Sequence, residues 1–207
     1  MKVDLHVHTK YSGHSLLSVE RVARVAKQRG LDAVAITDHD EVRGAFELSK
    51  VFPTIIGEEV SCSEGDVIGL FLHEKVGRGS AGEVMDKIRA QGGLVMIPHP
   101  FDRLRRGIVD QDICARADII EVFNSRVTRG RDNIKAVAFT KLKGIPAVVG
   151  SDAHTSLEIG RSWMEIDTIS DPKSFMMALA TAHMHTRKSP LYVHLQTKLL
   201  KLRGASR

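Results

Sequence analysis

The stretch Val3-Asp4-Leu5-His6-Val7-His8 alternates apolar and polar residues with a period of two. Successive side chains of a β-strand point to opposite faces, so Asp4, His6 and His8 share one face of a strand that begins near residue 2. Both faces of a parallel sheet are normally covered, and ionisable groups buried there without partners are costly. A metal ion would remove that cost, but a single His-x-His pair also occurs at ordinary polar strand ends.

Imidazole and carboxylate groups recur just beyond further apolar strands. They stand in Thr37-Asp38-His39-Asp40, Gly57-Glu58-Glu59-Val60-Ser61, Pro98-His99-Pro100 and Gly150-Ser151-Asp152-Ala153-His154. In α/β barrels the loops at the C-terminal ends of the strands converge on one rim. Histidines buried independently of one another would each need a hydrogen-bond partner of their own at every strand. One shared set of ions is simpler, so the pattern predicts a multinuclear metal site at this rim.

Short runs rich in Val and Ile alternate with segments of helical spacing, which predicts β/α units on a parallel sheet. Ser18 and Gly30 are typical residues for the start and end of a helix between them. The expected strands are 2–7, 32–37, 54–60, 66–72, 94–98, 118–123, 145–149 and 162–167, and the expected helices are 18–29, 80–91, 131–143 and 172–182.

The composition is that of a globular protein. The 207 residues are 43% hydrophobic and 27% charged, which excludes a disordered, collagen-like or rod-shaped chain and makes one domain the default. Cys62 and Cys114 have no metal-binding or redox spacing, so reduced thiols are expected. The polar N-terminus does not resemble a signal peptide, and no apolar run reaches the roughly 18 residues of a membrane span. We therefore expect a cytoplasmic protein.

The net charge of +5 is concentrated at the C-terminus. Residues 183–207 hold six basic residues and no acid, and removing these six from the 30 basic residues leaves 24 against 25 acidic ones. Tyr192, Leu195, Leu199 and Leu202 lie on one stripe of a helix. We expect a barrel domain over 1–182 and a basic segment over 183–207, either a helix docked on the barrel or an arm that binds nucleic acid or a partner.

The five motifs resemble, in order, those of the PHP superfamily, which is named for polymerase and histidinol phosphatase. The matching motifs extend from Asp4-Leu5-His6-Val7-His8-Thr9 to Gly150-Ser151-Asp152-Ala153-His154 and cover residues 1 to about 170. The resemblance implies a distorted (β/α)7 TIM-like barrel with up to three metal ions at the C-terminal strand ends. Mixed imidazole and carboxylate donors suit Zn, Mn or Fe, so we expect two or three such divalent ions. The resemblance also implies that the metal ligands are His6, His8, His39, Glu59, His99, Asp152 and His154, with Glu59 bridging.

Two positions depart from the family pattern. His14 stands where the family often has an Asp ligand, and imidazole in place of a carboxylate removes one negative charge from the cluster. Asp66 stands near a position that is often His. We favour Asp66 over His73, which lies on the opposite strand face by parity.

Further side chains are candidates for supporting roles around a metal-bound water. Asp4, Asp38 and Asp40 are placed to hold imidazole tautomers, as metal-bound histidines usually require. For the substrate phosphate we expect a contact from Arg103, or from Arg126 with Asn124, because guanidinium groups match phosphate oxygens. Ordinary solvated loop charges remain the alternative for these residues.

Three functions are compatible with this sequence. The first is a metal-dependent phosphoesterase, a phosphoric ester hydrolase acting on a small phosphorylated metabolite or nucleotide. The second is a nuclease, or an enzyme trimming nucleic-acid phosphates, whose basic segment binds the backbone. The third, a non-catalytic PHP module, is disfavoured by the nearly complete set of ligands. Few aromatic residues, 5% of the chain, disfavour a platform for stacking bases, so the first function is preferred.

Overall fold

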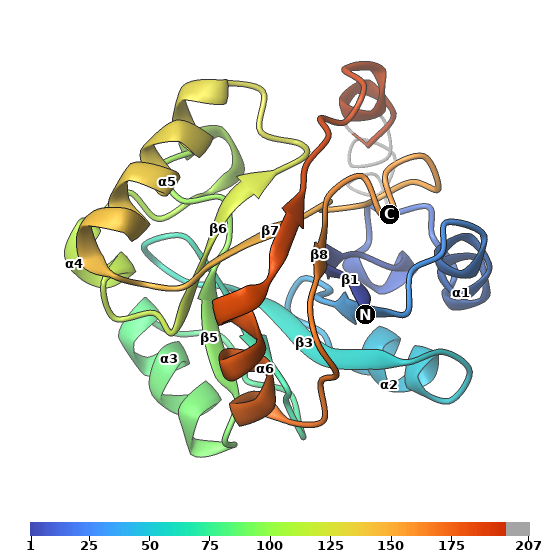
Figure 1. The fold of residues 1–207 in the computed structure, drawn as a ribbon, viewed down its shortest axis with the longest axis horizontal. Helices are drawn as coiled ribbons and strands as arrows, with labels where there is room; N and C mark the ends of the chain where they lie inside the picture. Colours follow the sequence, from blue (N-terminus) through green and yellow to red (C-terminus); the bar gives the residue numbers. More distant parts are fainter. Residues whose placement is uncertain (198–207) are drawn as a thin grey trace.

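The computed structural model describes residues 1–197, and the structural statements that follow concern these residues. One continuous sheet has the strand order β7-β6-β5-β4-β3-β2-β1-β8-β9 (Figure 1). The strands are β1 Lys2–Val7, β2 Ala33–Ile36, β3 Thr54–Ser61, β4 Asp66–Leu70, β5 Leu94–Ile97, β6 Ile119–Asn124, β7 Ala147–Gly150, β8 Trp163–Glu165 and β9 His183–His185.

The sheet curls into a nearly closed barrel because the chain just beyond β7 pairs with the end of β1. Val7 and Ala153 form an isolated parallel bridge. The His8 N–H donates to the Ala153 carbonyl at 2.9 Å, and the Ala153 N–H donates to the His6 carbonyl at 3.2 Å. The predicted distorted TIM-like barrel is confirmed, and its closure sets Asp152 and His154 beside His6 and His8.

The sheet is mixed rather than parallel throughout. β4 runs antiparallel to both β3 and β5, and β8 runs antiparallel to β1. Only a short turn joins β3 to β4, where the Cys62 N–H donates to the Gly65 carbonyl at 2.9 Å. A parallel crossover needs a dozen or more residues, so this connection has to produce a hairpin.

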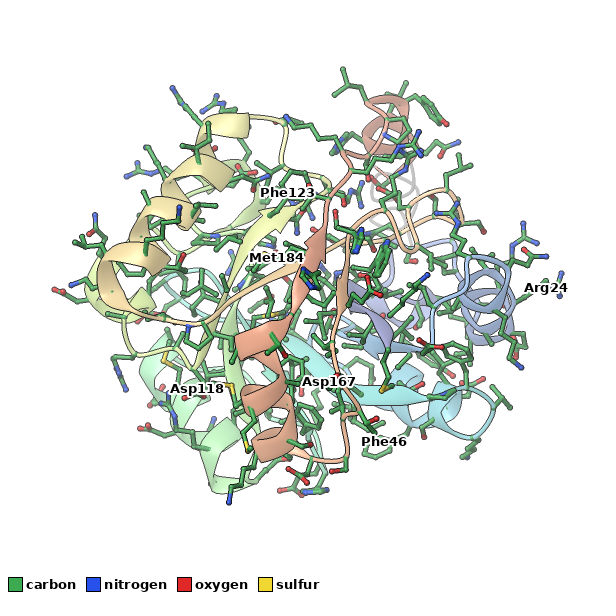
Figure 2. The ribbon with its side chains drawn as sticks, viewed as in Figure 1. Arg24, Phe46, Asp118, Phe123, Asp167 and Met184 are labelled. Atoms are coloured by element: carbon green, nitrogen blue, oxygen red, sulfur yellow. The ribbon has the colours of Figure 1, made fainter. Side chains whose placement is uncertain are left out.

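Helices cover the outside of the sheet (Figure 1). Ser18 caps the start of α1, and its side chain accepts from the Arg21 N–H. Arg24 on the outer face of α1 points away from the sheet (Figure 2). α2 and α4 were not predicted, because seven- and four-residue helices carry little periodic signal. The helices are α1 Val19–Gln28, α2 Arg43–Ser49, α3 Ala81–Ala90, α4 Gln111–Cys114, α5 Gly130–Lys143 and α6 Pro172–Ala178.

Two apolar clusters fill the space between the sheet and these helices. Val22 and Leu48 belong to the cluster under α1 and α2. Ile88, Phe139 and Phe175 belong to the larger cluster under α3, α5 and α6. The apolar side chains of β1 belong to these clusters. Its polar side chains, Asp4 and His6, therefore face the interior of the barrel.

The sheet continues past residue 182, the boundary expected from the sequence, because β9 pairs antiparallel with β8. Residues 192–197 are helical. The remainder of the predicted C-terminal helix lies in 198–207, outside the described residues. Within residues 1–197, no helix is long and apolar enough to cross a membrane.

Candidate metal centre

Four fully buried side chains converge at one end of the barrel. His6 of β1 and His8, just beyond its end, have their Nε2 atoms 3.0 Å apart. Glu59 of β3 places Oε2 3.4 Å from the His6 Nε2 and 3.2 Å from the His8 Nε2. Asp152, just beyond β7, places Oδ1 3.8 and 3.3 Å from the same two nitrogens.

The other predicted ligands extend this cluster in two directions. The second oxygen of Glu59, Oε1, lies 3.1 Å from the His99 Nε2, and the His39 Nδ1 lies 3.3 Å from Oε2. On the far side, the Nε2 atoms of His154 and His14 lie 2.9 Å apart. Three groups have ligand atoms within 4.8 Å of one another: His8, His39 and His154; His6, Glu59 and His99; and His6, His8 and Asp152.

Hydrogen bonds at the Nδ1 atoms fix which ring nitrogen carries the proton. The His6 Nδ1 lies 3.0 Å from Glu121 Oε1, and the His154 Nδ1 lies 2.9 Å from the Asp152 main-chain carbonyl. The His14 Nδ1 lies 2.9 Å from the Ser12 carbonyl. Since these oxygens can only accept, each neutral ring donates from Nδ1 and directs an Nε2 lone pair into the cluster.

The cluster thus contains acceptors that face other acceptors. The Nε2 lone pair of His6 points toward the oxygens of Glu59 and Asp152, and in residues 1–197 the buried Asp152 Oδ1 and His99 Nδ1 lack a hydrogen-bond partner. Such a set is stable only with cations or extra protons between its members. Mixed imidazole and carboxylate donors suit Zn, Mn or Fe(II), so these residues fit divalent metal ions.

The electrostatics of the metal-free cluster lead to the same conclusion. Burial would lower the pKa of His6, but the carboxylates of Asp152, Glu121 and Glu59 raise it well above its ordinary value. Burial, with the charges of His8 and Arg126, holds the pKa of His154 well below its ordinary value. His6 therefore keeps a proton that a metal ion would displace, whereas His154 already offers a neutral ring.

Glu121, in the middle of β6, was missed by the sequence reasoning. Besides facing the His6 Nδ1, it accepts the His99 N–H at 2.8 Å and the Asn124 Nδ2 at 2.9 Å through Oε2. It is 1% exposed. The signal that could have found it is a lone acidic residue inside the apolar run Ile119-Ile120-Glu121-Val122-Phe123, where a charge needs a partner.

The three aspartates predicted to hold imidazoles act differently. Asp40 accepts the Ser61 N–H at 2.9 Å and pairs with Arg78. Asp4 accepts from the main-chain N–H groups of Ser151 at 3.0 Å and Gly160 at 2.8 Å, so it fixes the backbone near Asp152 instead of an imidazole ring. Asp38 acts on His8 through a hydroxyl. Ser12 Oγ donates to Asp38 at 2.6 Å and lies 3.1 Å from the His8 Nδ1.

Beside the cluster lies a cavity of about 630 Å³, here called the central cavity. Arg105 reaches Asp152 with its guanidinium, and the Arg106 Nε lies 3.0 Å from Asp66 Oδ1. Positive charge is thereby placed next to the histidines. The cavity is lined by His14, His39, Asp66, His99, Asp102, Leu104, Arg105, Arg106, Arg126, Thr128, His154, His194 and Thr197.

The predicted substrate residues are only partly at this cavity. Arg103 lies in the short 3-10 helix Arg103–Arg105 and lines a separate hollow with Phe101, because successive side chains of that turn diverge. Asn124 is fully buried and donates to Glu121 and Asp152, so it orients carboxylates instead of lining the cavity. Arg126 does line the cavity, although its Nε pairs with Glu158 at 3.2 Å.

The two departures from the family pattern are both at the central cavity. His14 faces His154, and Asp66 lies across the cavity paired with Arg106. Burial and the Glu59 charge raise the pKa of Asp66 to about 6. His73 lines a different hollow, so of the two alternatives Asp66 is the one near the cluster.

Known families and relatives match this chain along most of its length. The PHP domain family matches residues 4–72, and the PHP-associated family matches residues 130–182. Uncharacterized protein MJ1587 of Methanocaldococcus jannaschii is 39% identical over 141 residues, which are 60% of this chain and 82% of its own. The chain belongs to the PHP family.

Two further comparisons place this PHP protein among its relatives. A probable phosphatase of Thermoanaerobacter sp. strain X514 is 24% identical over 204 residues, covering 77% of this chain and 81% of its own. A two-domain protein from Bacteroides vulgatus, containing a predicted PHP-like metal-dependent phosphoesterase, has a TM-score of 0.72 at 17% identity. That match covers 90% of this chain and 65% of the other, and it shows that the fold is shared.

Proposed function

We propose that this PHP protein is a metal-dependent phosphoesterase that hydrolyses a small phosphorylated metabolite or nucleotide. The observation that carries the proposal is the set of imidazole lone pairs and carboxylate oxygens converging beside a cavity that three arginines line. The name of the Thermoanaerobacter relative, a probable phosphatase, agrees with it. The hydrolase class follows from the same family and relatives.

We assign two or three divalent ions, Zn, Mn or Fe, to this rim. Ions bound there would supply a water of lowered pKa, from about 16 towards 7, and positive charge for the oxygens of a phosphate ester. The residues that would hold them are His6, His8, His14, His39, Glu59, Asp66, His99, Asp152 and His154.

The arginines of the central cavity supply charge for the substrate. Arg105 and Arg106 come from the loop after β5, and their guanidinium groups can bind phosphate oxygens in a forked arrangement. Arg106 is the more exposed, with 57% of its side chain accessible, so it is free to turn from Asp66 to an entering phosphate. Both replace Arg103 in the role expected from the sequence.

The cavity volume favours a small substrate over a polymer. Sites for small molecules are commonly about 300–1,000 Å³, and the central cavity falls in this range at about 630 Å³. The basic residues that would favour nucleic acid are concentrated in 198–207, outside the described residues. Nucleic acid is therefore kept as a test substrate.

A substrate panel tests the proposal. The full chain, loaded in turn with Mn, Zn and Fe(II), is assayed for phosphate release from phosphomonoesters, nucleotides and short oligonucleotides. We expect turnover of at least one small phosphate ester, and loss of that turnover in His8→Ala and Asp152→Ala. Cleavage of oligonucleotides alone, with binding that falls steeply as salt rises, would favour the nuclease. A protein that takes up no metal and hydrolyses nothing would instead be a non-catalytic module.

A further inference from the structure

The end of the described chain crosses the rim of the barrel and reaches the central cavity. Three hydrogen bonds attach it before its helix begins: the Arg187 N–H donates to Ser162 Oγ at 3.2 Å, the Ser189 N–H to the Ser125 carbonyl at 2.8 Å, and Arg161 Nη1 to the Lys188 carbonyl at 3.0 Å. Figure 1 shows this segment in red, above the strand ends. It is therefore a fixed part of the rim.

A buried arginine connects the helix of residues 192–197 to the metal centre. Arg126 is 3% exposed, and its Nη2 donates to Thr197 Oγ1 at 2.7 Å. Its Nε lies 3.2 Å from Glu158 Oε1, while the other oxygen of Glu158 accepts the His154 N–H at 3.1 Å. Val193, in the first turn of this helix, has a fully buried side chain.

This arrangement brings His194 to the central cavity. It matches none of the family motifs, and no pattern in the sequence predicted this position. Its half-buried side chain lines the cavity together with Arg105 and His154. Burial, with the nearby charges of Arg126 and Arg105, lowers the pKa of His194 to about 4. At neutral pH its ring is uncharged, with one donor and one acceptor nitrogen.

We propose that His194 is a specificity residue that hydrogen-bonds the organic part of the substrate, on a cavity wall formed by the C-terminal helix. The inference rests on the proposed phosphoesterase function and names its substrate class: phosphate esters whose organic part carries hydroxyl groups, as sugars do. A neutral imidazole suits such groups, whereas the phosphate dianion is matched by Arg105 and Arg106. The cavity is larger than one phosphate group needs, which leaves room for this part.

Two phosphonates that cannot be hydrolysed separate recognition of the head group from recognition of the organic part. Methylphosphonate has only the anionic head, while the phosphonate analogue of ribose 5-phosphate adds hydroxyl groups. Binding of each to the metal-loaded full chain is measured by titration calorimetry. We expect wild type to bind the ribose phosphonate at least tenfold more tightly, and His194→Ala to lose about tenfold for this ligand alone, the size of one hydrogen bond.

Controls separate this role from a structural one. His194→Gln, which keeps a donor and an acceptor, should recover part of the loss, and His183→Ala on the exposed strand β9 should change neither affinity. Equal affinity of wild type for the two ligands, an unchanged preference in His194→Ala, or an equal loss for both ligands would each overturn the assignment. A different result would overturn the proposed phosphoesterase function. In that case the metal-loaded wild type would bind neither phosphonate and would release no phosphate from any ester.

Discussion

At the scale of single residues, the acceptors around the Nδ1 atoms decide what the histidines can do. A carboxylate faces the Nδ1 of His6, and main-chain carbonyls face those of His14 and His154. Each contact holds one ring orientation and one tautomer, which is the usual support of a metal-binding histidine. The chemistry of the rim therefore depends also on the Glu121 carboxylate and on main-chain carbonyls, groups that are not assigned to a metal.

Glu121→Gln should weaken metal binding while the fold is kept. One amide oxygen cannot replace both carboxylate oxygens, which face His6 on one side and the His99 N–H and Asn124 on the other. Losing such a partner typically costs about 10- to 100-fold in metal affinity. Competition with a chelator measures it, and the matched control is Glu58→Gln, whose carboxylate accepts from the Val76 N–H instead. Equal metal affinity in wild type and Glu121→Gln would contradict this role.

Because of His194, the protein should become less stable as the pH falls below about 6.5. Its pKa is about 4 in the folded state against 6.5 for an ordinary histidine. Between these values the unfolded chain binds a proton that the folded chain does not, so stability is lost as pH falls from 6.5 towards 4. Thermal unfolding at pH 7 and pH 5 should therefore show a smaller loss for His194→Gln than for wild type. An equal loss in both proteins would count against a half-buried, neutral ring at His194.

The donors of the rim could be predicted from the sequence, but of the residues that support them only some, such as Asp38, could be. The histidines and acids after the strands could be predicted, because the C-terminal ends of barrel strands meet at one rim. Glu121, Arg105 and His194 were not assigned, because their positions depend on the register of β6, on a tight turn and on the path of the C-terminal segment. None of these three features can be predicted from the local sequence pattern.

At the scale of elements, the end of β7 shows how closely the strands must approach. Gly150 lies where a Cβ atom would meet Glu121 Oε1 and the Cβ of His6. Only glycine lets β6, β7 and β1 come together here. The predicted sheet was parallel, and β4 is where this prediction was wrong. The turn before Gly65 is too short for a crossover, so β4 runs antiparallel to β3.

Gly150→Ala should be destabilising and should reduce metal content. Forcing a methyl group into a packed site costs about 1–3 kcal/mol, and relief requires moving His6 or Glu121. Gly130→Ala is the matched control, because its Cβ would meet only the Lys188 Nζ at an ordinary 3.4 Å. Denaturant unfolding and elemental analysis of both variants measure the effects. A stable, fully metal-loaded Gly150→Ala protein would contradict the close packing described.

At the scale of the whole molecule, the metal centre joins parts of the barrel that are far apart in sequence. Its side chains come from β1, β3 and the segments after β2, β5 and β7, so bound ions would act as cross-links between them. Without ions, the buried carboxylates and lone pairs repel one another. Metal binding and folding are coupled in such a site.

Removal of metal should lower the melting temperature. Ions present at 1,000 times their dissociation constant stabilise the folded state by about 4 kcal/mol, which corresponds to roughly 10 °C for a domain of this size. Calorimetry of the metal-loaded protein before and after chelation measures the difference. His8→Ala should show a smaller difference. An unchanged melting temperature in wild type would indicate that metals do not bind the folded state.

The metal centre is tested by elemental analysis of the purified full chain, after loading with Zn, Mn or Fe(II) and removal of free metal. We expect two or three bound ions per chain in wild type and a lower number in His8→Ala and Asp152→Ala. Fewer than about one ion per ten chains in wild type with every metal, or the same content in the variants, would contradict it.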